Sequence, residues 1–334
     1  MSSTANHPPS LPQVLNLDAS AVRSTLSYPT LISHLRSSLP SVSLSLHSPL
    51  RHNHTIDEPT SSSLLLMPSW STSPSLPYIG VKILTSFPQN SSSNLPGINA
   101  SYVLFDSSNG QTLASMEGTE LTLWRTSSQS ALASTYLSRT DSEVLVMVGA
   151  GALAYHLVRA HLHVRPSLKR VFVWNRTVAK AEALVRRLGE EGVGEVVFEV
   201  AEGLEEVIGL GDIISCATGS DRPLVFGERM KRGAHLDLVG SFGASMRECD
   251  DKALRRGRVF VDCEAALEES GELLGAFERG VLERGDVEGR LVELVSGEKV
   301  GRRGDEEVTV FKSVGSAVLD ILAAQLVYED FLQR

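Results

Sequence analysis

The sequence predicts an α/β protein in which a doubly wound parallel sheet is joined to a second lobe of α+β structure. The chain has 334 residues, which exceeds the usual size of a domain with one core. Beyond about residue 140, short apolar runs alternate with helical segments, as parallel strands do when helices cover both faces of a sheet. Before that point charge is sparse, and β-type runs alternate with Ser, Pro and Asn breaks. The two halves therefore predict two different lobes.

The first lobe is expected to be rich in strands. The Pro/Ser segments 68–77 and 88–96 are expected to be loops, and Asn109-Gly110 is a strong signal for a tight turn. The expected strands are Ser63–Met67, Tyr78–Thr85, Ser101–Phe105 and Thr112–Met116.

A helix is expected to lead out of the first lobe. Apolar residues between Thr119 and Leu137 recur at loosely helical spacing, and Arg125 lies inside this segment. The alternation of strands and helices begins after it. The expected strands are Val144–Val148, Val171–Trp174, Glu195–Val200, Ile213–Ala217, His235–Val239 and Val259–Asp262.

Cap residues and periodicity predict the remaining helices. Thr177 is placed to cap a helix over residues 178–188, which Gly189 would end. Residues 264–284 form a second long helical stretch, and residues 301–305 a polar turn. The segment Val314–Leu332 is amphipathic and is expected to pack back on the first lobe. We therefore expect residues 1–125 with 313–334 to form one lobe and residues 126–312 the other.

The composition excludes several classes of function. With a formal net charge of −9, the chain is not expected to bind nucleic acid, because phosphate neutralisation requires clustered Lys and Arg. The three cysteines, Cys216, Cys249 and Cys263, lack metal-ligand spacing, which favours a reducing compartment and no structural zinc. No apolar run is long enough to span a bilayer and no secretion signal is evident, so we expect a soluble protein without membrane contact.

The N-terminal region supports two interpretations. The first 51 residues are rich in Ser, poor in acids and contain Arg23, Arg36 and Arg51, a composition typical of plastid transit peptides. However, residues 14–18 and Arg51 also fit the start of a folded protein. We therefore expect at most about a dozen leading residues to be spare.

A glycine-rich turn directly follows the expected strand Val144–Val148. Gly149-Ala150-Gly151-Ala152-Leu153-Ala154 is the G-x-G-x-x-A form of the dinucleotide fingerprint of Rossmann sheets. Its glycines permit a tight turn and let backbone N–H groups and a helix N-terminus approach a pyrophosphate. A glycine turn without a ligand is the competing interpretation, but strand, turn, helix and second strand occur here in the required order.

The end of the next strand indicates which dinucleotide binds. NAD enzymes usually place Asp or Glu there for the ribose hydroxyls, whereas this chain has Asn175, Arg176 and Thr177. A guanidinium can hold a 2′-phosphate that a carboxylate would repel. These residues favour NADPH, and the competing interpretation of Arg176 is an ordinary solvated arginine beside a helix cap.

Several motifs, taken in order, resemble the ornithine cyclodeaminase/mu-crystallin family over nearly the whole chain. They are Ser48–Arg51, Gly80–Lys82, Phe87–Asn90, Leu121–Thr126, the glycine turn and Phe311–Gly315. The runs Leu65–Trp70, Trp174–Thr177 and Val239–Phe242 are most similar to the plant members, ketimine reductases that make pipecolate from dehydropipecolate in systemic immunity.

The resemblance implies that Arg51, Lys82 and Arg125 bind the carboxylate of the substrate, with Lys82 and Arg125 close to the chemistry. Three cations that converge in an acidic protein are chemically suited to an anionic ligand. Each also has a structural interpretation, because Lys82 could extend to solvent and Arg125 could pair with Glu120 or Asp141.

The family's cyclodeaminases carry an aspartate where this sequence has Ser241. A hydroxyl is a poor proton acceptor for ornithine deamination. Reduction of a protonated cyclic imine requires mainly that it be held against the nicotinamide. The difference favours a reductase, in which Ser241 would hydrogen-bond the ring nitrogen or a water molecule.

The resemblance also implies cofactor contacts at the strand ends, where ligands bind in doubly wound sheets. The residues implied are Cys216, Ala217 and Thr218, then Val239, Gly240 and Ser241, and a loop of Lys312, Ser313, Val314 and Gly315 that closes over the nicotinamide. Asp262, Glu264, Glu268 and Glu269 form an acidic run that fits a solvated helix start better than a metal site, so no metal is expected.

The function expected from these residues is NADPH-dependent reduction of a small cyclic imino acid, with Δ1-piperideine-2-carboxylate as the first choice and L-pipecolate as product. One alternative is an ornithine cyclodeaminase or alanine-type dehydrogenase on the same scaffold. The other is a non-catalytic, NADPH-dependent binder of a small carboxylate, as mu-crystallin is. The resemblance further implies a homodimer formed through the sheet of the first lobe, and a plastid location, with the cytoplasm as the alternative.

Overall fold

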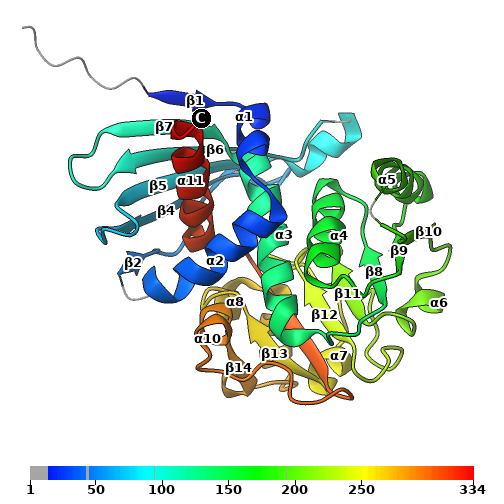
Figure 1. The fold of residues 1–334 in the computed structure, drawn as a ribbon. Coiled ribbons are helices and arrows are strands. Elements are labelled where there is room, and N and C mark those ends of the chain that lie inside the picture. Colours follow the sequence, from blue (N-terminus) through cyan, green and yellow to red (C-terminus); the bar gives the residue numbers. More distant parts are fainter. Residues whose placement is uncertain (1–13, 43–44, 94, 193) are drawn as a thin grey trace, which may run out of the picture.

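The chain forms two lobes, each built on one sheet (Figure 1). The structure, a computed structural model, describes residues 14–42, 45–93, 95–192 and 194–334. The dozen or so leading residues that were expected to be spare lie outside these ranges. Within them, the first element is β1 (Leu15–Leu17). No described helix combines the length and apolar character needed to cross a membrane.

The first lobe contains a seven-stranded sheet within the described residues, in the order β1-β7-β6-β5-β4-β2, with β3 also paired to β4. The helix α11 (Ala317–Leu332) packs against β4 and β5, and α1 (Ala19–Thr25) and α2 (Tyr28–Val42) pack beside it. The C-terminal helix thus rejoins the first lobe, as expected. The strands are β1, β2 (Leu46–His47), β3 (His52–Asp57), β4 (Ser62–Ser71), β5 (Tyr78–Ser86), β6 (Ile98–Asp106) and β7 (Thr112–Glu117).

The register of this sheet gives it two different faces. Met67 pairs with Lys82, and Lys82 with Tyr102, so these three side chains share the face that α11 covers, where all are buried. The neighbouring positions, which point to the other face, are apolar but only partly buried. They are Leu64, Leu66, Pro68, Trp70, Ile79, Val81, Ile83, Val103 and Phe105.

The second lobe contains an eight-stranded sheet whose described strands are all parallel, in the order β10-β9-β8-β11-β12-β15-β13-β14. This confirms the predicted doubly wound Rossmann arrangement. The strands are β8 (Val144–Val148), β9 (Arg170–Trp174), β10 (Val197–Val200), β11 (Ile213–Cys216), β12 (His235–Leu238), β13 (Gly257–Val261), β14 (Val287–Arg290) and β15 (Val308–Lys312).

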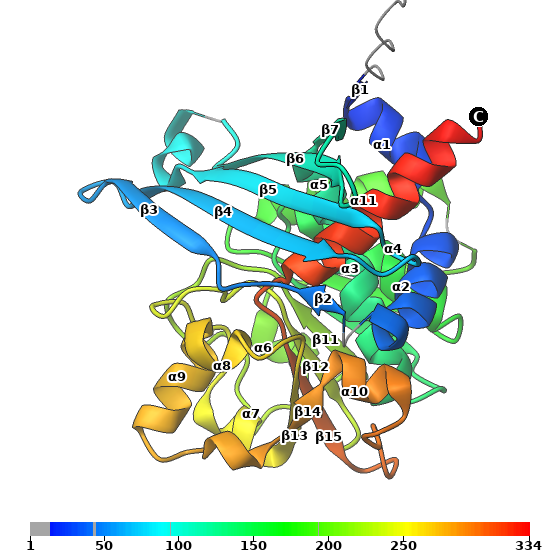
Figure 2. The ribbon, with the colours of Figure 1, turned by 90° about the vertical axis from the view of Figure 1, so that its left-hand side faces the viewer.

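Helices cover this sheet and connect its strands (Figures 1 and 2). They are α4 (Ala152–Val164), α5 (Val178–Glu191), α6 (Leu204–Ile208), α7 (Asp251–Arg256), α8 (Ala266–Glu269), α9 (Gly271–Glu278) and α10 (Leu291–Ser296). In the part of the chain that the structure describes, two short 3₁₀ helices occur at Pro88–Ser93 and Arg284–Asp286.

The helix α3 (Gly118–Leu137) joins the two lobes. It packs against α2 of the first lobe and α4 of the second, and Figure 1 shows it running between them. Ser130 donates a hydrogen bond to the buried carboxylate of Asp237 in β12 at 3.0 Å, and Ser215 and His161 contact the same carboxylate. This buried polar network fixes α3 to the Rossmann sheet, and so positions Arg125 relative to it.

One expected loop and one expected helix end were wrong. Residues 68–71, expected to be part of a loop, belong to β4. Along one edge of β4, β3 pairs with residues before Pro68 and β2 with residues after it. Pro68 lies in the gap between these two partners, where a residue without an N–H is tolerated. Gly189 does not end α5, which continues to Glu191 and ends at Gly192 with a positive φ of 58°. A glycine inside a helix costs only about 1 kcal/mol.

The segment 264–284 and the strand β15 also differ from expectation. Ser270 is extended and accepts a hydrogen bond from the backbone N–H of Leu273, so it divides the expected long helix into α8 and α9. The buried run Val308–Lys312 forms β15 between β12 and β13, where no strand was predicted. Lys312 therefore lies in a strand and not in a loop.

Candidate active site

The glycine turn has the geometry that the fingerprint requires. Gly149 adopts a φ of +111°, and a Cβ there would lie 2.6 Å from the carbonyl oxygen of Ala217. Gly151 precedes α4, where no side chain caps the helix and a Cβ would meet nothing within 4 Å. Ala152 and Leu153 form the first turn of α4. The N-terminal amides of a 13-residue helix are thus open to an anion such as a pyrophosphate.

The residues after β9 lie beside this turn. Asn175 accepts a hydrogen bond from the backbone N–H of Ala150 at 3.1 Å and donates one to the carbonyl of Thr177 at 2.9 Å. Arg176 is exposed, and within the described residues no ion pair or hydrogen bond engages its guanidinium. Thr177 precedes α5 but makes no side-chain cap. The guanidinium is therefore available to a ligand at the glycine turn.

The ends of β11 and β12 are joined by one buried carboxylate, Glu248. It accepts hydrogen bonds from the backbone N–H and the hydroxyl of Thr218, at 2.6 and 2.8 Å, and from the N–H of Gly240 at 2.8 Å. Burial raises the pKa of Glu248 to about 7. These contacts hold the two strand ends together along the crevice, next to Cys216, which is buried, and Val239.

Ser241 lies in a second buried network, next to the first. Its hydroxyl accepts a hydrogen bond from Lys312 Nζ at 2.7 Å and donates one to Glu272, whose other oxygen accepts from the N–H of Glu248. Ser241, Lys312 and Glu272 have no exposed surface. Ser241 and Lys312 thus contact each other in this structure. A contact of either residue with substrate or cofactor stays a prediction.

Lys82 and Arg125 converge on a carboxylate that the sequence analysis missed. Lys82 Nζ lies 2.8 Å from Asp320 Oδ2, and Arg125 Nε lies 2.9 Å from Asp320 Oδ1. The three groups come from β5, α3 and α11, and all are buried. Burial lowers the pKa of Lys82 to about 8, although Asp320 opposes the shift. Burial alone would raise the pKa of Asp320. The positive charges of Arg125 and Lys82 have the larger effect, and the pKa of Asp320 therefore lies below its usual value.

Arg51 joins this cluster from the other side. Its guanidinium donates to the carbonyls of Val314 and Gly315, at 3.2 and 3.3 Å, and pairs with Glu269 of α8 at 2.6 Å. Gly315 has a φ of +87°, and a Cβ there would lie 3.1 Å from two nitrogens of Arg125. The structure therefore brings Arg51, Lys82 and Arg125 together around the segment 313–315, which follows β15.

The cation cluster and the glycine turn lie along the same edge of the Rossmann sheet. Neighbouring strand ends are in contact from Gly149 through Ala217–Thr218 and Gly240–Ser241 to Lys312–Gly315. These contacts span β8, β11, β12 and β15, three strand spacings or about 14 Å. An extended dinucleotide with its pyrophosphate at the turn can therefore reach the cations with its other end.

Comparisons with known proteins assign the chain to a family. The profile of the ornithine cyclodeaminase/mu-crystallin family matches residues 14–334. The chain belongs to this family. It is 56% identical over 319 residues to the protein SAR DEFICIENT 4 of Arabidopsis thaliana, covering 95% of this chain and 98% of the relative.

Solved structures of similar proteins extend the comparison. The Δ1-pyrroline-2-carboxylate reductase of Thermococcus litoralis, in complex with NADH and L-proline, is 31% identical with a TM-score of 0.91, over 96% of this chain and 98% of that one. An archaeal alanine dehydrogenase dimer with bound NAD is 27% identical with a TM-score of 0.87, over 96% of each chain. Both of these solved structures thus contain a bound nicotinamide dinucleotide.

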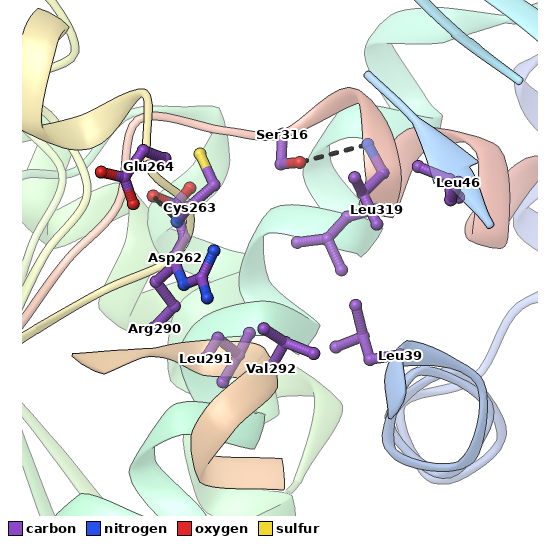
Figure 3. A pocket seen from close by; sticks show the side chains of 11 residues that line it. Leu39, Leu46, Asp262, Cys263, Glu264, Arg290, Leu291, Val292, Ser316 and Leu319 are labelled. Carbon is purple, nitrogen blue, oxygen red and sulfur yellow. Dashed lines mark hydrogen bonds between the residues drawn. The ribbon is translucent and has the colours of Figure 1, made fainter. Parts of the chain in front are cut away.

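In this member of the ornithine cyclodeaminase/mu-crystallin family, a cavity of about 150 Å³ lies between the lobes (Figure 3). Leu39 and Leu319 line it from the first lobe, and Asp262 and Arg290 from the second. Asp262 Oδ2 also accepts hydrogen bonds from the N–H groups of Val314 and Gly315, at 3.2 and 2.9 Å. The cavity therefore borders the segment Val314–Gly315, whose carbonyl oxygens accept hydrogen bonds from Arg51.

The acidic run after β13 was only partly understood from the sequence. Glu268 pairs with Arg284 on the surface and Glu264 is exposed, as a solvated helix start requires. Asp262 and Glu269 instead hold the segment 313–315 and Arg51, so the expectation of solvated side chains was wrong for both. No group of three or more potential ligands that could hold a metal ion occurs in the described residues.

Proposed function

We propose that the protein reduces a cyclic ketimine carboxylate with NADPH, and that its preferred reaction converts Δ1-piperideine-2-carboxylate to L-pipecolate. The observation that carries this proposal is the convergence of Arg51, Lys82 and Arg125 at the sheet edge that also bears the glycine turn. The Thermococcus litoralis reductase, with its bound L-proline, supports a cyclic imino acid as the class of substrate. The choice of the six-membered ring rests on the resemblance to the plant reductases.

In the proposed reaction, the protein binds and orients the substrate. Arg51, Lys82 and Arg125 hold the carboxylate by charge-assisted hydrogen bonds, which leaves the adjacent imine carbon facing the crevice. When bound, the nicotinamide supplies the hydride. A protonated C=N bond is already electrophilic, so the main requirements are position and exclusion of water. The burial of Lys82 and Arg125 supports both.

We further propose that NADPH is preferred to NADH because of Arg176. Its exposed guanidinium lies between Asn175, which contacts the glycine turn, and the start of α5. A 2′-phosphate there would accept hydrogen bonds from the guanidinium and from the amide or hydroxyl groups of Asn175 and Thr177. The two solved relatives contain NADH and NAD, so the preference is a property of this chain that requires its own test.

A spectrophotometric assay tests the proposed function directly. NADPH and NADH oxidation would be followed with Δ1-piperideine-2-carboxylate, Δ1-pyrroline-2-carboxylate and pyruvate with ammonia. We expect NADPH with the six-membered ring to give the highest kcat/KM. Release of ammonia from ornithine would indicate a cyclodeaminase instead, and carboxylate binding without turnover would indicate a binding protein.

The protonation state of Lys82 predicts how carboxylate binding depends on pH. Lys82 binds a carboxylate only when protonated, and burial lowers its pKa to about 8. Because the imine of the substrate titrates as well, the binding of L-pipecolate is measured instead: its affinity should be retained below about pH 8 and fall about tenfold per pH unit above it. In Lys82→Arg, whose guanidinium does not titrate there, the fall should disappear. A fall that persists in Lys82→Arg would contradict the role of Lys82.

The partly exposed face of the first sheet supports a homodimer, as in the archaeal alanine dehydrogenase. Trp70 and Ile83 on this face are 36% and 38% exposed. We propose that a second copy of the chain covers it. Val81→Asp would place a charge in this interface, and light scattering should then show half the molar mass of the wild-type protein. Val197→Asp, at an exposed apolar position in β10, is the control and should leave the mass unchanged.

The plastid location and a role in systemic immunity remain proposals that rest on the resemblance. Residues 15–42 form β1, α1 and α2, so the Ser-rich composition of this region belongs to the fold. Localisation of the full-length chain fused to a fluorescent protein at its C-terminus would distinguish the plastid from the cytoplasm.

A further inference from the structure

Asp320 is a charged residue within an otherwise apolar part of α11. Its neighbours Leu319 and Ile321 are buried in the core, and Asp320 itself has no exposed surface. It lies opposite Lys82 and Arg125, which come from two other elements, at 2.8 and 2.9 Å. One side chain thus contacts both of the buried cations that are proposed to bind the substrate.

The charges of this cluster do not cancel. Lys82, Arg125 and Asp320 together carry a net charge of +1 when all are ionised, whereas Arg51 has its own partner in Glu269. Burying an unbalanced charge is unfavourable, and a buried ion pair contributes little to stability by itself. One carboxylate from a ligand would balance the cluster. Asp320 therefore leaves the site with the charge that suits a monocarboxylate.

The groups around Lys82 also define its protonation. Asp320 from α11 favours the charged form, while Arg125 from α3 and Arg51 from the segment before β3 disfavour it. Tyr102, on the neighbouring strand β6, is neutral because burial raises its pKa well above its usual value. Asp320 is thus the anion that stabilises the positive charge of Lys82.

We propose that Asp320 is a positioning residue that holds Lys82 and Arg125 on one point, and so sets both the affinity for the substrate carboxylate and the pH at which this affinity is lost. The inference rests on the proposed function, because it requires that the two cations bind a carboxylate. Asp320 does not contact the substrate in this proposal. It acts through the two cations.

The test compares Asp320→Asn with the wild-type protein, both saturated with NADP⁺, by calorimetric titration with L-pipecolate from pH 6 to 9. Removing an opposite charge at this distance should lower the pKa of Lys82 by about 1–3 units. The pH above which binding weakens should therefore move from about 8 in the wild type to about 7 or below in Asp320→Asn. Affinity at pH 8 should fall at least about fivefold, because a shift of one unit lowers the protonated fraction of Lys82 from about one half to about one tenth. The affinity for NADP⁺ should not change.

Asp330→Asn is the matched control, because Asp330 lies on the same helix in an exposed pair with Arg334. It should retain the wild-type affinity and pH profile. If Asp320→Asn binds L-pipecolate with the wild-type pH profile, the inference is overturned. If the wild type itself binds neither L-pipecolate nor L-proline, the proposed function fails instead, so the two failures are distinguishable.

Asp320→Glu keeps the test decisive if Asp320→Asn does not fold. The longer side chain preserves the charge but moves the carboxylate by about one C–C bond, roughly 1.5 Å. The pH profile should then stay near that of the wild type while the affinity for L-pipecolate falls. Unchanged affinity in Asp320→Glu would contradict the positioning role.

Discussion

Arg125→Ala is expected to lower kcat/KM for the imino acid about 100- to 1,000-fold, with NADPH affinity changed less than about twofold. Arg125 is buried on α3 and contacts Asp320 and the segment at Gly315. Its loss removes a bidentate, charge-assisted interaction with the substrate carboxylate, worth about 3–4 kcal/mol, and each 1.4 kcal/mol is a factor of ten. Steady-state kinetics and fluorescence titration with NADPH measure the two effects.

Arg23→Ala is the control for this change. Arg23 pairs with Glu120, at the start of the same helix, but its side chain is largely exposed, so its loss should change kcat/KM less than about threefold. Removal of Arg125 also leaves Asp320 with one cation, and thermal unfolding should be measured for both variants. An equal loss of imino acid and NADPH affinity in folded Arg125→Ala would contradict the carboxylate role.

Arg176→Asp is expected to reduce the ratio of kcat/KM for NADPH to that for NADH by about 100-fold or more. The substitution removes a charge-assisted contact with the 2′-phosphate and adds a charge that repels it, while a carboxylate at this position can accept hydrogen bonds from the ribose hydroxyls of NADH. Because Arg176 is exposed and without a described partner, the fold should tolerate the change.

Arg187→Asp makes the same change of charge near the other end of α5, where Arg187 pairs with Glu191. It should leave the cofactor preference within about twofold of the wild type, since an exposed pair contributes at most about 1 kcal/mol. An unaltered preference in Arg176→Asp, with NADPH bound as tightly as before, would remove the basis for the NADPH proposal.

Local patterns predicted most of the fold because each strand and helix carries its own signal. The strand Val144–Val148 was predicted with its observed bounds, since a buried apolar run directly precedes the glycine turn. β15 has the same length but was missed, since its place between β12 and β13 rests on contacts with segments distant in sequence. Ser270 shows the same limit, because a serine inside a helical pattern becomes a cap only in its tertiary context.

The residues of the candidate site were also predicted only in part. Arg51, Lys82 and Arg125 were found through motifs, but their anionic partners were not. Asp320 and Glu269 are far from them in sequence, and no local spacing connects a carboxylate in α11 or α8 to a lysine in β5 or an arginine before β3. The one available signal was the presence of Asp320 among the apolar residues of an amphipathic helix, where a buried charge requires a partner.

A crystal structure of the protein with NADP⁺ and L-pipecolate tests the central claim most directly. We predict that the carboxylate of the ligand lies within about 3 Å of donor atoms of Arg51, Lys82 and Arg125. The ring carbon next to it should lie about 3–3.5 Å from C4 of the nicotinamide. A ligand held elsewhere, for example at Arg290 in the cavity between the lobes, with the three cations left on Asp320 and Glu269, would contradict the account.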